Sequence, residues 1–200
     1  MKPHSSGILT VVLAAGQSSR MGSPKPLLTV GGISFLKRIV NLHKGLGLEV
    51  CVVLGEHREA IQRSVDLSGV SVVINRQPEL GQLSSIQLGV AHAEGRNAII
   101  VHPVDHPLVS PETLEALLAA HAKAPDRILT PECNGKTGHP TLFPSHFFSD
   151  LLTAPLDQGA RYVIAERHSA VRRVTVKDEG ILKNIDTPED YRRWVGPTDN

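Results

Sequence analysis

Two cations and a run of small residues follow the first apolar segment of the chain. Residues 8–13 (ILTVVL) are rich in β-branched side chains, which indicates a strand buried on both faces. Small residues at 14–16 come next, and a polar loop then carries Arg20 and Lys25. Backbone N–H groups in such a turn can point at anionic oxygens, and the two cations supply charge. The stretch therefore predicts a cradle for a polyphosphate.

Lys25 stands between Pro24 and Pro26. We expect the two prolines to restrict its backbone to an extended conformation, so that the reach of the ammonium is partly set in advance. An ordinary turn is the alternative for a loop rich in glycine and serine. The loop does not fit the P-loop pattern, because Ser23 and Pro24 follow Gly22, and it does not fit G-x-G-x-x-G.

A carboxylate follows another apolar run directly. Asp105 comes just after residues 98–101 (AIIV) and is flanked by Pro103 and Pro107. In an open parallel sheet, ligands bind at the carboxyl ends of strands, and Mg²⁺ prefers one or two carboxylates together with phosphate oxygens and water. Asp105 is too far upstream to cap the helix expected to start at Ser110. The position therefore predicts a magnesium ligand.

A glycine also leads into a serine-rich helix start. Gly81 precedes Ser84 and Ser85, and the segment can offer N–H and O–H groups to a base or a ribose. An ordinary N-cap formed by Ser84 is the alternative.

The elements that must position these groups alternate along the first part of the chain. Strands are predicted at residues 8–13, 49–54, 70–74 and 98–101, and helices at about 34–46, 56–65, 84–93 and 110–123. This alternation predicts βαβ units with right-handed crossovers and a mainly parallel sheet.

The later part of the chain is less regular. Shorter strands are predicted at 128–130 and 140–143, helices at 145–152 and 159–168, an edge or antiparallel strand at 170–176, and a short strand, a turn and a capped helix within 183–194. We interpret this part as a mixed-sheet cap over the parallel half, followed by a frayed tail at residues 197–200.

Length and composition restrict the class of protein. The 200 residues suggest a single domain, 1–200, and a net charge of +1 with 4% aromatic residues argues against a nucleic-acid partner. Cys51 and Cys133 have no metal-ligand spacing and do not suggest a disulfide scaffold. Lys2 and the apolar run after it imitate a signal peptide only weakly, and no run approaches the roughly 18 apolar residues of a membrane span. We therefore expect a cytoplasmic protein with no membrane partner.

The motifs taken together resemble a known family. The string from Leu13 to Lys25 (LAAGQSSRMGSPK) resembles the signature loop of the MobA-like NTP transferase family, in particular its molybdenum cofactor cytidylyltransferase (MocA-like) branch. Residues 81–86 (GQLSSI) resemble the second nucleotide-contacting segment of that family, and Pro-x-Asp-x-Pro at 103–107 resembles its metal-binding motif. Residues 184–190 (NIDTPED) resemble a further motif, Asp-Ile-Asp-Thr-Pro-Glu-Asp, with Asn184 in place of the first Asp.

The resemblance implies a fold and a reaction. The fold would be a three-layer αβα, Rossmann-like nucleotidyltransferase fold, similar to glycosyltransferase A, with a mostly parallel mixed sheet. The reaction would be transfer of a nucleoside monophosphate to a phosphate-bearing acceptor with release of pyrophosphate, through Arg20, Lys25 and Asp105 as catalytic residues. Mg²⁺ would lie on Asp105 and Asp186, although Asp186 could instead cap the last helix. The implied nucleotide-binding residues are Leu13, Ala14, Ala15, Gly16, Arg20, Lys25, Gly81, Ser84 and Ser85.

The acceptor side is implied by two further motifs. Gly138-His139-Pro140 and the segment around Arg161 resemble acceptor-side motifs of the cytidylyltransferase branch, and they favour molybdopterin cofactor as acceptor and CTP as donor. His106 stands where the family more often has Gln or Met, so its role in acceptor binding stays open. GTP as donor, a sugar- or alcohol-phosphate acceptor, and a non-catalytic nucleotide-binding chaperone that delivers cofactor to a molybdoenzyme remain alternatives.

Overall fold

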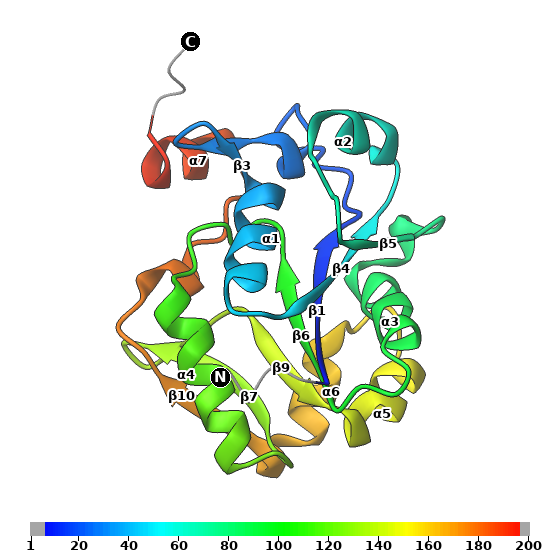
Figure 1. Ribbon diagram of the computed structural model, residues 1–200, viewed down its shortest axis with the longest axis vertical. Coiled ribbons are helices and arrows are strands. Elements are labelled where there is room, and N and C mark those ends of the chain that lie inside the picture. Colours follow the sequence, from blue (N-terminus) through cyan, green and yellow to red (C-terminus); the bar gives the residue numbers. More distant parts are fainter. Residues whose placement is uncertain (1–6, 197–200) are drawn as a thin grey trace.

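One sheet runs through the middle of the molecule (Figure 1). Its strands are β1 (Ile8–Ala14), β4 (Glu49–Leu54), β5 (Ser71–Ile74), β6 (Ala98–Pro103), β7 (Ile128–Cys133), β8 (Lys136–Thr137), β9 (Thr141–Pro144) and β10 (Val171–Thr175). In the computed structural model, which describes residues 7–196, these eight strands follow the order β10-β7-β9-β6-β1-β4-β5, with β8 paired to β7. The expected tail at 197–200 lies outside the described residues. A separate small hairpin joins β2 (Thr29–Val30) to β3 (Ile33–Ser34).

The sheet is mixed but mostly parallel, as predicted. Strand β1 pairs in parallel with both β4 and β6, and β4 pairs in parallel with β5. Strand β9 is antiparallel to β6 and to β7, and the edge strand β10 is parallel to β7. The later strands pair in a mixed manner, but the prediction that they form a cap over the parallel half was wrong, because β9, β7 and β10 extend the same sheet through continuous backbone pairing.

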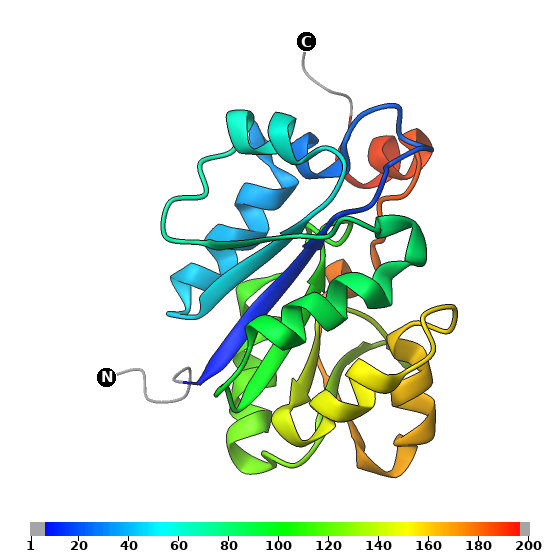
Figure 2. The ribbon, with the colours of Figure 1, turned by 90° about the vertical axis from the view of Figure 1, so that its right-hand side faces the viewer.

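Helices cover both faces of this sheet. They are α1 (Phe35–Gly45), α2 (Arg58–Ser64), α3 (Gln82–His92), α4 (Pro111–Lys123), α5 (Phe148–Thr153), α6 (Ala160–Glu166) and α7 (Pro188–Trp194). Figures 1 and 2 show α1 and α4 on one face and α3, α5 and α6 on the other, which is the predicted three-layer αβα arrangement. Single 3-10 turns lie at Lys25–Leu27, Pro78–Leu80, Ser145–Phe147, His168–Ala170 and Glu179–Leu182. No helix in the described part of the chain is both long and apolar enough to span a membrane.

Strand β1 shows why its sequence is apolar almost without interruption. Successive side chains of a strand point to opposite faces. Val11 packs in the cluster that contains Ile86 of α3, and Val12 packs in the cluster that contains Phe35 of α1. Both faces of the strand are therefore buried, as parallel sheets with helices on each side require.

Two local expectations were wrong. Lys25 is not extended but begins the 3-10 turn Lys25–Leu27, because its carbonyl accepts the N–H of Leu28 at 3.1 Å and its own N–H donates to the Ser18 hydroxyl at 2.9 Å. No strand forms near residue 183. Gly180 instead lies so close to the carbonyl of Leu108 that a Cβ atom there would stand 2.1 Å from that oxygen, and the Asp178 carboxylate accepts the Gly180 N–H. These contacts fold the segment into the turn Glu179–Leu182.

Two histidines lie in the core without any exposed surface. His43 of α1 and His102 of β6 are each 0% exposed, as is Thr10 of β1. Nitrogens of the two imidazoles are 2.9 Å apart, and the Thr10 hydroxyl is 2.9 Å from the other ring nitrogen of His43. Burial lowers the pKa of His102 to about 3, and burial and the neighbouring His102 lower the pKa of His43 well below its usual range. Both side chains are therefore neutral at physiological pH.

These buried imidazoles predict a protein that loses stability in mild acid. Below its ordinary pKa, near 6.5, an unfolded His102 takes up a proton, whereas the folded protein does not until about pH 3. The unfolded state then binds more protons, so the free energy of unfolding falls as the pH falls. By pH 5 this loss amounts to about 2 kcal/mol for His102, and His43 acts in the same direction. Urea unfolding at pH 7, 6 and 5 measures it. The replacement His92→Gln, at an exposed histidine, should leave the pH dependence unchanged. A free energy of unfolding that is flat from pH 7 to pH 5 would contradict the prediction.

Candidate active site

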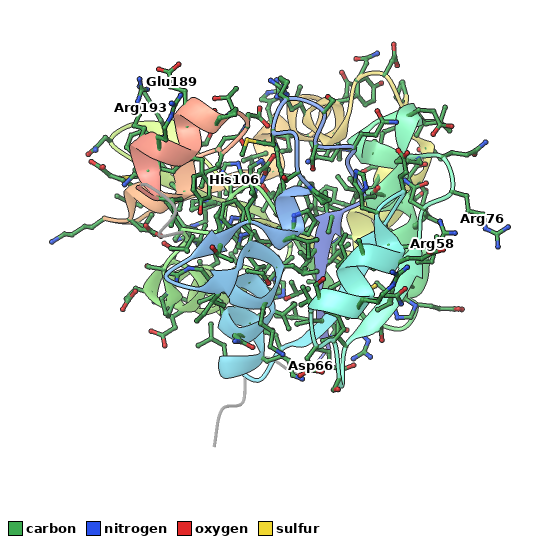
Figure 3. The ribbon with its side chains drawn as sticks, turned by 90° about the horizontal axis from the view of Figure 1, so that it is seen from above. Arg58, Asp66, Arg76, His106, Glu189 and Arg193 are labelled. Carbon is green, nitrogen blue, oxygen red and sulfur yellow. The ribbon has the colours of Figure 1, made fainter. Side chains whose placement is uncertain are left out.

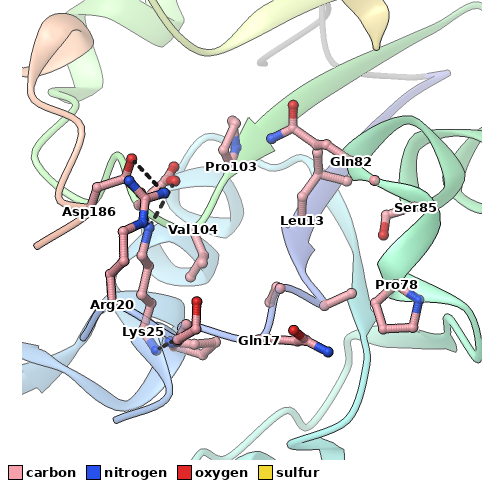
Figure 4. Close-up of a pocket in the computed structure, with 18 of the residues that line it drawn as sticks. Leu13, Gln17, Arg20, Lys25, Pro78, Gln82, Ser85, Pro103, Val104 and Asp186 are labelled. Carbon is pink, nitrogen blue, oxygen red and sulfur yellow. Dashed lines mark hydrogen bonds and ion pairs between the residues drawn. The ribbon is translucent and has the colours of Figure 1, made fainter. Parts of the chain in front are cut away.

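The predicted site segments meet in one cleft at the carboxyl edge of the sheet (Figure 4). The cleft has a volume of about 420 Å³ and is lined by the loop after β1, the start of α3, the turn after β6, and Asp186. It brings together eight of the nine residues predicted to bind nucleotide: Leu13, Ala14, Ala15, Gly16, Arg20, Lys25, Gly81 and Ser85. Asp105 and Asp186 also line it.

Ser84 is the exception. Its hydroxyl donates to the carbonyl of Gly81 at 2.7 Å and accepts from the buried amide of Asn75 at 2.8 Å. The same amide group donates to Ser85 at 2.9 Å. Helix α3 begins at Gln82 with Gly81 as its N-cap, so the alternative in which Ser84 caps the helix was wrong. Asn75 thus joins the end of β5 to the first turn of α3.

Hydrogen bonds to Ser18 close the loop after β1. The Ser18 hydroxyl accepts the N–H of Lys25 at 2.9 Å, and the Ser18 carbonyl accepts the N–H of Met21 at 2.9 Å. From the other side, Gly55 packs directly on the backbone, because a Cβ atom at Gly55 would lie 2.3 Å from the carbonyl oxygen of Ala15. The backbone that would face a polyphosphate is therefore held on both sides.

The ammonium of Lys25 lies between two carboxylates. Its Nζ is 3.3 Å from Oδ2 of Asp105 and also donates a hydrogen bond to Oδ1 of Asp186. Arg20 adds a second cation, with Nη2 3.3 Å from Oδ2 of Asp186. Figure 4 shows Arg20 and Lys25 extending side by side from the loop toward Asp186. Two carboxylates 81 positions apart in the sequence thus share one cation.

Two backbone features hold these carboxylates together. The N–H of Ile185 donates to the carbonyl of Asp105 at 2.9 Å, which ties the segment before α7 to the turn after β6. Helix α7 is capped by Thr187, whose hydroxyl accepts the N–H of Asp190 while the Asp190 carboxylate accepts the N–H of Thr187. Asp186 therefore does not cap the helix, and its carboxylate faces the cleft.

The carboxylates have the properties of a cation site. Burial alone would raise the pKa of Asp186, but the hydrogen bond from Lys25 and the charges of Lys25 and Arg20 lower it overall. Oδ1 of Asp105 is buried and has no hydrogen-bond partner. No cluster of three or more His, Cys, Asp and Glu side chains suited to a metal occurs within residues 7–196. Any metal would therefore depend on these two carboxylates and on oxygens of its ligand.

A second cavity of about 360 Å³ shares Gly81 and Gln82 with the cleft. His139 and Arg161, predicted to bind an acceptor, both line it. His106 does not line it, but its ring contacts that of His139, with centroids 4.8 Å apart and the ring planes tilted by 59°. His106 is 7% exposed, and Figure 3 shows it near the middle of the view, whereas the labelled charged side chains lie farther out.

Both of these histidines are neutral at physiological pH. Burial lowers the pKa of His106 to about 3, with His139 and Lys25 acting in the same direction. Burial also lowers the pKa of His139. Nδ1 of each ring is buried without a hydrogen-bond partner, so each ring retains hydrogen-bonding capacity beside the site.

Gln82 is the residue that the sequence analysis missed. It lies within the segment 81–86, but only the glycine and the serines of that segment have an evident role from sequence. The structure places Gln82 at the first position of α3, where it lines the cleft (Figure 4). It also lines the second cavity, so it lies in the wall between the two. No sequence pattern could have identified Gln82, because its position in a wall shared by two cavities is visible only in the three-dimensional structure.

The fold and the site define a nucleotidyltransferase. A family model described as the MobA-like NTP transferase domain matches residues 10–171. The chain belongs to this family.

The chain is also similar in sequence to individual proteins with different names. The chain is 30% identical over 195 residues to a protein named nicotine blue oxidoreductase from Paenarthrobacter nicotinovorans, a match that covers 92% of this chain and 95% of the relative. It is 33% identical over 134 residues to the bifunctional protein GlmU of Alkaliphilus metalliredigens, which covers 64% of this chain but only 29% of the longer relative.

A solved structure covers almost the whole chain. Rv0371c from Mycobacterium tuberculosis H37Rv superposes with a TM-score of 0.83 at 29% identity, and the match covers 96% of this chain and 99% of that one. A further structure of Rv0371c is a complex with manganese, with a TM-score of 0.78, 26% identity, and coverage of 95% and 98%.

The shared ammonium predicts a change in carboxylate titration when it is removed. In Lys25→Met, Asp186 keeps its burial, which disfavours the charged form, but loses its nearest cation, so its pKa should rise. Titration of the ¹³C carboxyl resonance of Asp186 measures this change. Lys37→Met is the matched control, because Lys37 pairs with Asp66 instead, and it should leave Asp186 unchanged. An unmoved Asp186 in Lys25→Met would contradict the bridging ion pair.

Proposed function

We propose that this protein transfers CMP from CTP to the terminal phosphate of molybdopterin cofactor and releases pyrophosphate, in a reaction that depends on Mg²⁺. One observation carries the proposal: a cleft with two cations and two carboxylates shares a wall with a second cavity that contains His139 and Arg161. A donor and an acceptor bound in the two cavities would meet at Gly81 and Gln82. Two buried, free cysteines, Cys51 and Cys133, agree with a cytoplasmic location.

On the donor side, Arg20 and Lys25 would bind the triphosphate. Both line the cleft and are already oriented by carboxylates. Backbone N–H groups of residues 14–16 would add neutral donors, because this segment forms the floor of the cleft next to the cations. The role of these groups is to position the α-phosphorus and to offset charge as pyrophosphate leaves.

The two carboxylates fit a divalent cation. Asp105 and Asp186 would hold Mg²⁺, since the pair already accepts one cationic group from Lys25 and Oδ1 of Asp105 has no hydrogen-bond partner. A bound Mg²⁺ supplies positive charge to the phosphate oxygens and favours departure of pyrophosphate. The manganese complex of Rv0371c supports a divalent ion in this family. Lys25 would then exchange part of its contact with the carboxylates for contact with phosphate.

On the acceptor side, Arg161 would pair with the anionic phosphate, and the neutral imidazole of His139 would orient it by hydrogen bonding. An oxygen of this phosphate would form the new bond to the α-phosphorus of CTP while the bond to pyrophosphate breaks. The nucleophile is already an anion, so no general base is required. This agrees with the lowered pKa of His106, which makes that imidazole a weak base.

The relative named nicotine blue oxidoreductase suggests a second candidate, an oxidoreductase activity, for which a nicotinamide dinucleotide is one cofactor to test. The loop after β1 contains no G-x-G-x-x-G pattern, and it carries two cations directed at carboxylates, an arrangement suited to polyphosphate and metal. We therefore favour nucleotidyl transfer, and we include NADH in the test.

A donor-by-acceptor screen tests the proposal. CTP and GTP are each combined with molybdopterin cofactor, a sugar phosphate and an alcohol phosphate in the presence of Mg²⁺, and pyrophosphate is measured, with NADH oxidation followed in parallel. We expect release with CTP and molybdopterin cofactor and at least a tenfold lower rate with GTP. Faster release with GTP would assign the guanylyltransferase alternative. Binding of nucleotide without release from any pair would favour the chaperone alternative.

The shared cation site makes a separate prediction for double substitution. Asp105→Asn and Asp186→Asn should each lower turnover by about two orders of magnitude, or about 2.7 kcal/mol. The double variant should lose far less than the sum, because both substitutions empty the same site. Turnover and its Mg²⁺ dependence are measured for all three proteins. Asp66→Asn, at a carboxylate that pairs with Lys37 instead, is the matched control and should leave turnover and its Mg²⁺ dependence unchanged. Additive losses would show that the carboxylates act separately.

A further inference from the structure

The two buried histidines described above belong to a longer series of hydrogen bonds. The Thr10 hydroxyl contacts Nδ1 of His43 at 2.9 Å, and Nε2 of His43 contacts Nδ1 of His102 at 2.9 Å. Nε2 of His102 then contacts the carbonyl oxygen of His106 at 3.0 Å. The series runs from β1 through α1 and β6 to the turn that carries Asp105.

The end of the series fixes the direction of every bond in it. A carbonyl oxygen can only accept, so Nε2 of His102 carries the proton. His102 is neutral, which leaves its Nδ1 bare and requires Nε2 of His43 to donate. His43 is neutral too, so its Nδ1 accepts from the Thr10 hydroxyl. Only one arrangement of protons satisfies all three bonds.

The turn at the end of this series is a four-residue turn closed by the N–H of His106 and the carbonyl of Pro103, 3.2 Å apart. Asp105 occupies its third position. Two backbone hydrogen bonds also hold the turn, since Val104 N–H donates to Leu13 and Ile185 N–H donates to Asp105. Both of those bonds lie before His106. The far side of the turn is held by the imidazole of His102 at the His106 carbonyl and, one residue later, by Arg38, which donates to the Pro107 carbonyl at 2.8 Å.

We propose that His43 and His102 are positioning residues, whose imidazoles form a directional relay of hydrogen bonds that holds the turn 103–106 and with it the carboxylate of Asp105. The relay ends on a backbone carbonyl, so it moves no proton to the site. Its catalytic consequence rests on the proposed function, whereas its geometry does not.

The completeness of the relay supports a positioning role. All four ring nitrogens of His43 and His102 have partners, whereas the buried Nδ1 atoms of His106, His121 and His139 have no hydrogen-bond partner. A fully satisfied buried network favours one arrangement of its members, because every alternative leaves a polar atom unpaired. Apolar side chains would fill the same space without specifying where the turn lies.

Three substitutions distinguish a role in positioning the Asp105 turn from a role in the stability of the fold alone. His43→Met removes the donor to His102, and His43→Gln has almost the same length but can place an amide N–H where Nε2 was. Thr10→Val also leaves one imidazole nitrogen without a donor, but the bond from His43 to His102 stays intact. We expect lower melting temperatures for both His43→Met and Thr10→Val, with an effect on the site only for His43→Met.

Mn²⁺ binding, followed by electron paramagnetic resonance, measures the site without any need for turnover. We expect binding at least fivefold weaker in His43→Met, and within threefold of the parent protein in His43→Gln and Thr10→Val. Pyrophosphate release should follow the same order, with at least a tenfold loss in His43→Met. Equal losses in His43→Met and Thr10→Val, or none in His43→Met, would overturn the proposal.

Nuclear magnetic resonance of the parent protein labelled with ¹⁵N-histidine tests the relay directly. This test does not depend on whether His43→Met folds. We expect both imidazoles protonated at Nε2, and a scalar coupling between Nε2 of His43 and Nδ1 of His102 across their hydrogen bond. The His43→Gln spectrum assigns the His43 signals. A proton on Nδ1 of either ring, or no coupling, would overturn the relay. If the parent protein shows this coupling but releases no pyrophosphate with any substrate pair, the proposed function fails while the relay stands.

Discussion

The parallel pairing of β1 with strands on both of its sides is the constraint from which the site follows. Its register sets Leu13 opposite Val53 of β4 and Pro103 of β6, so all three strands end at one level. The loop that carries Lys25 and the turn that carries Asp105 leave the sheet from adjacent strands at that level. Because β1 is buried on both faces and paired on both edges, neither loop can shift without loss of core packing.

Charge then determines how the loops are arranged around the cleft. Three segments distant in sequence contribute Lys25, Asp105 and Asp186, and the two carboxylates would repel each other without a cation between them. The ammonium neutralises them where they are partly withdrawn from water. The same arrangement that makes the carboxylates compatible with each other also makes them a cation site, so stability of the folded loops and affinity for a ligand are linked.

Sequence predicted those parts of the structure that local patterns encode. The alternation of apolar runs and helical periods gave the parallel half of the sheet, and the string from Leu13 to Lys25 located the cleft. The continuity of β9 and β7 with β6 was not predictable, because short strands carry no local signal of which neighbour they pair with. The side-chain partners within the site could not be predicted from the sequence pattern either. Lys25 and Asp186 are 161 positions apart, and no spacing rule joins them. Nothing in the sequence joins His43 to His102 either, because a series of hydrogen bonds through the core has no period in sequence.

The wall formed by Gly81 and Gln82 has a consequence for the end of the catalytic cycle. Under the proposed function, the product joins a molecule bound in one cavity to a molecule bound in the other, so it would occupy both cavities at once. Until it left, it would exclude the next donor and the next acceptor alike. Such a product would act as a bisubstrate ligand, competitive with each substrate, and its release rather than the chemistry would then limit the rate of repeated cycles. A receiving protein that takes the product from this wall would relieve that inhibition.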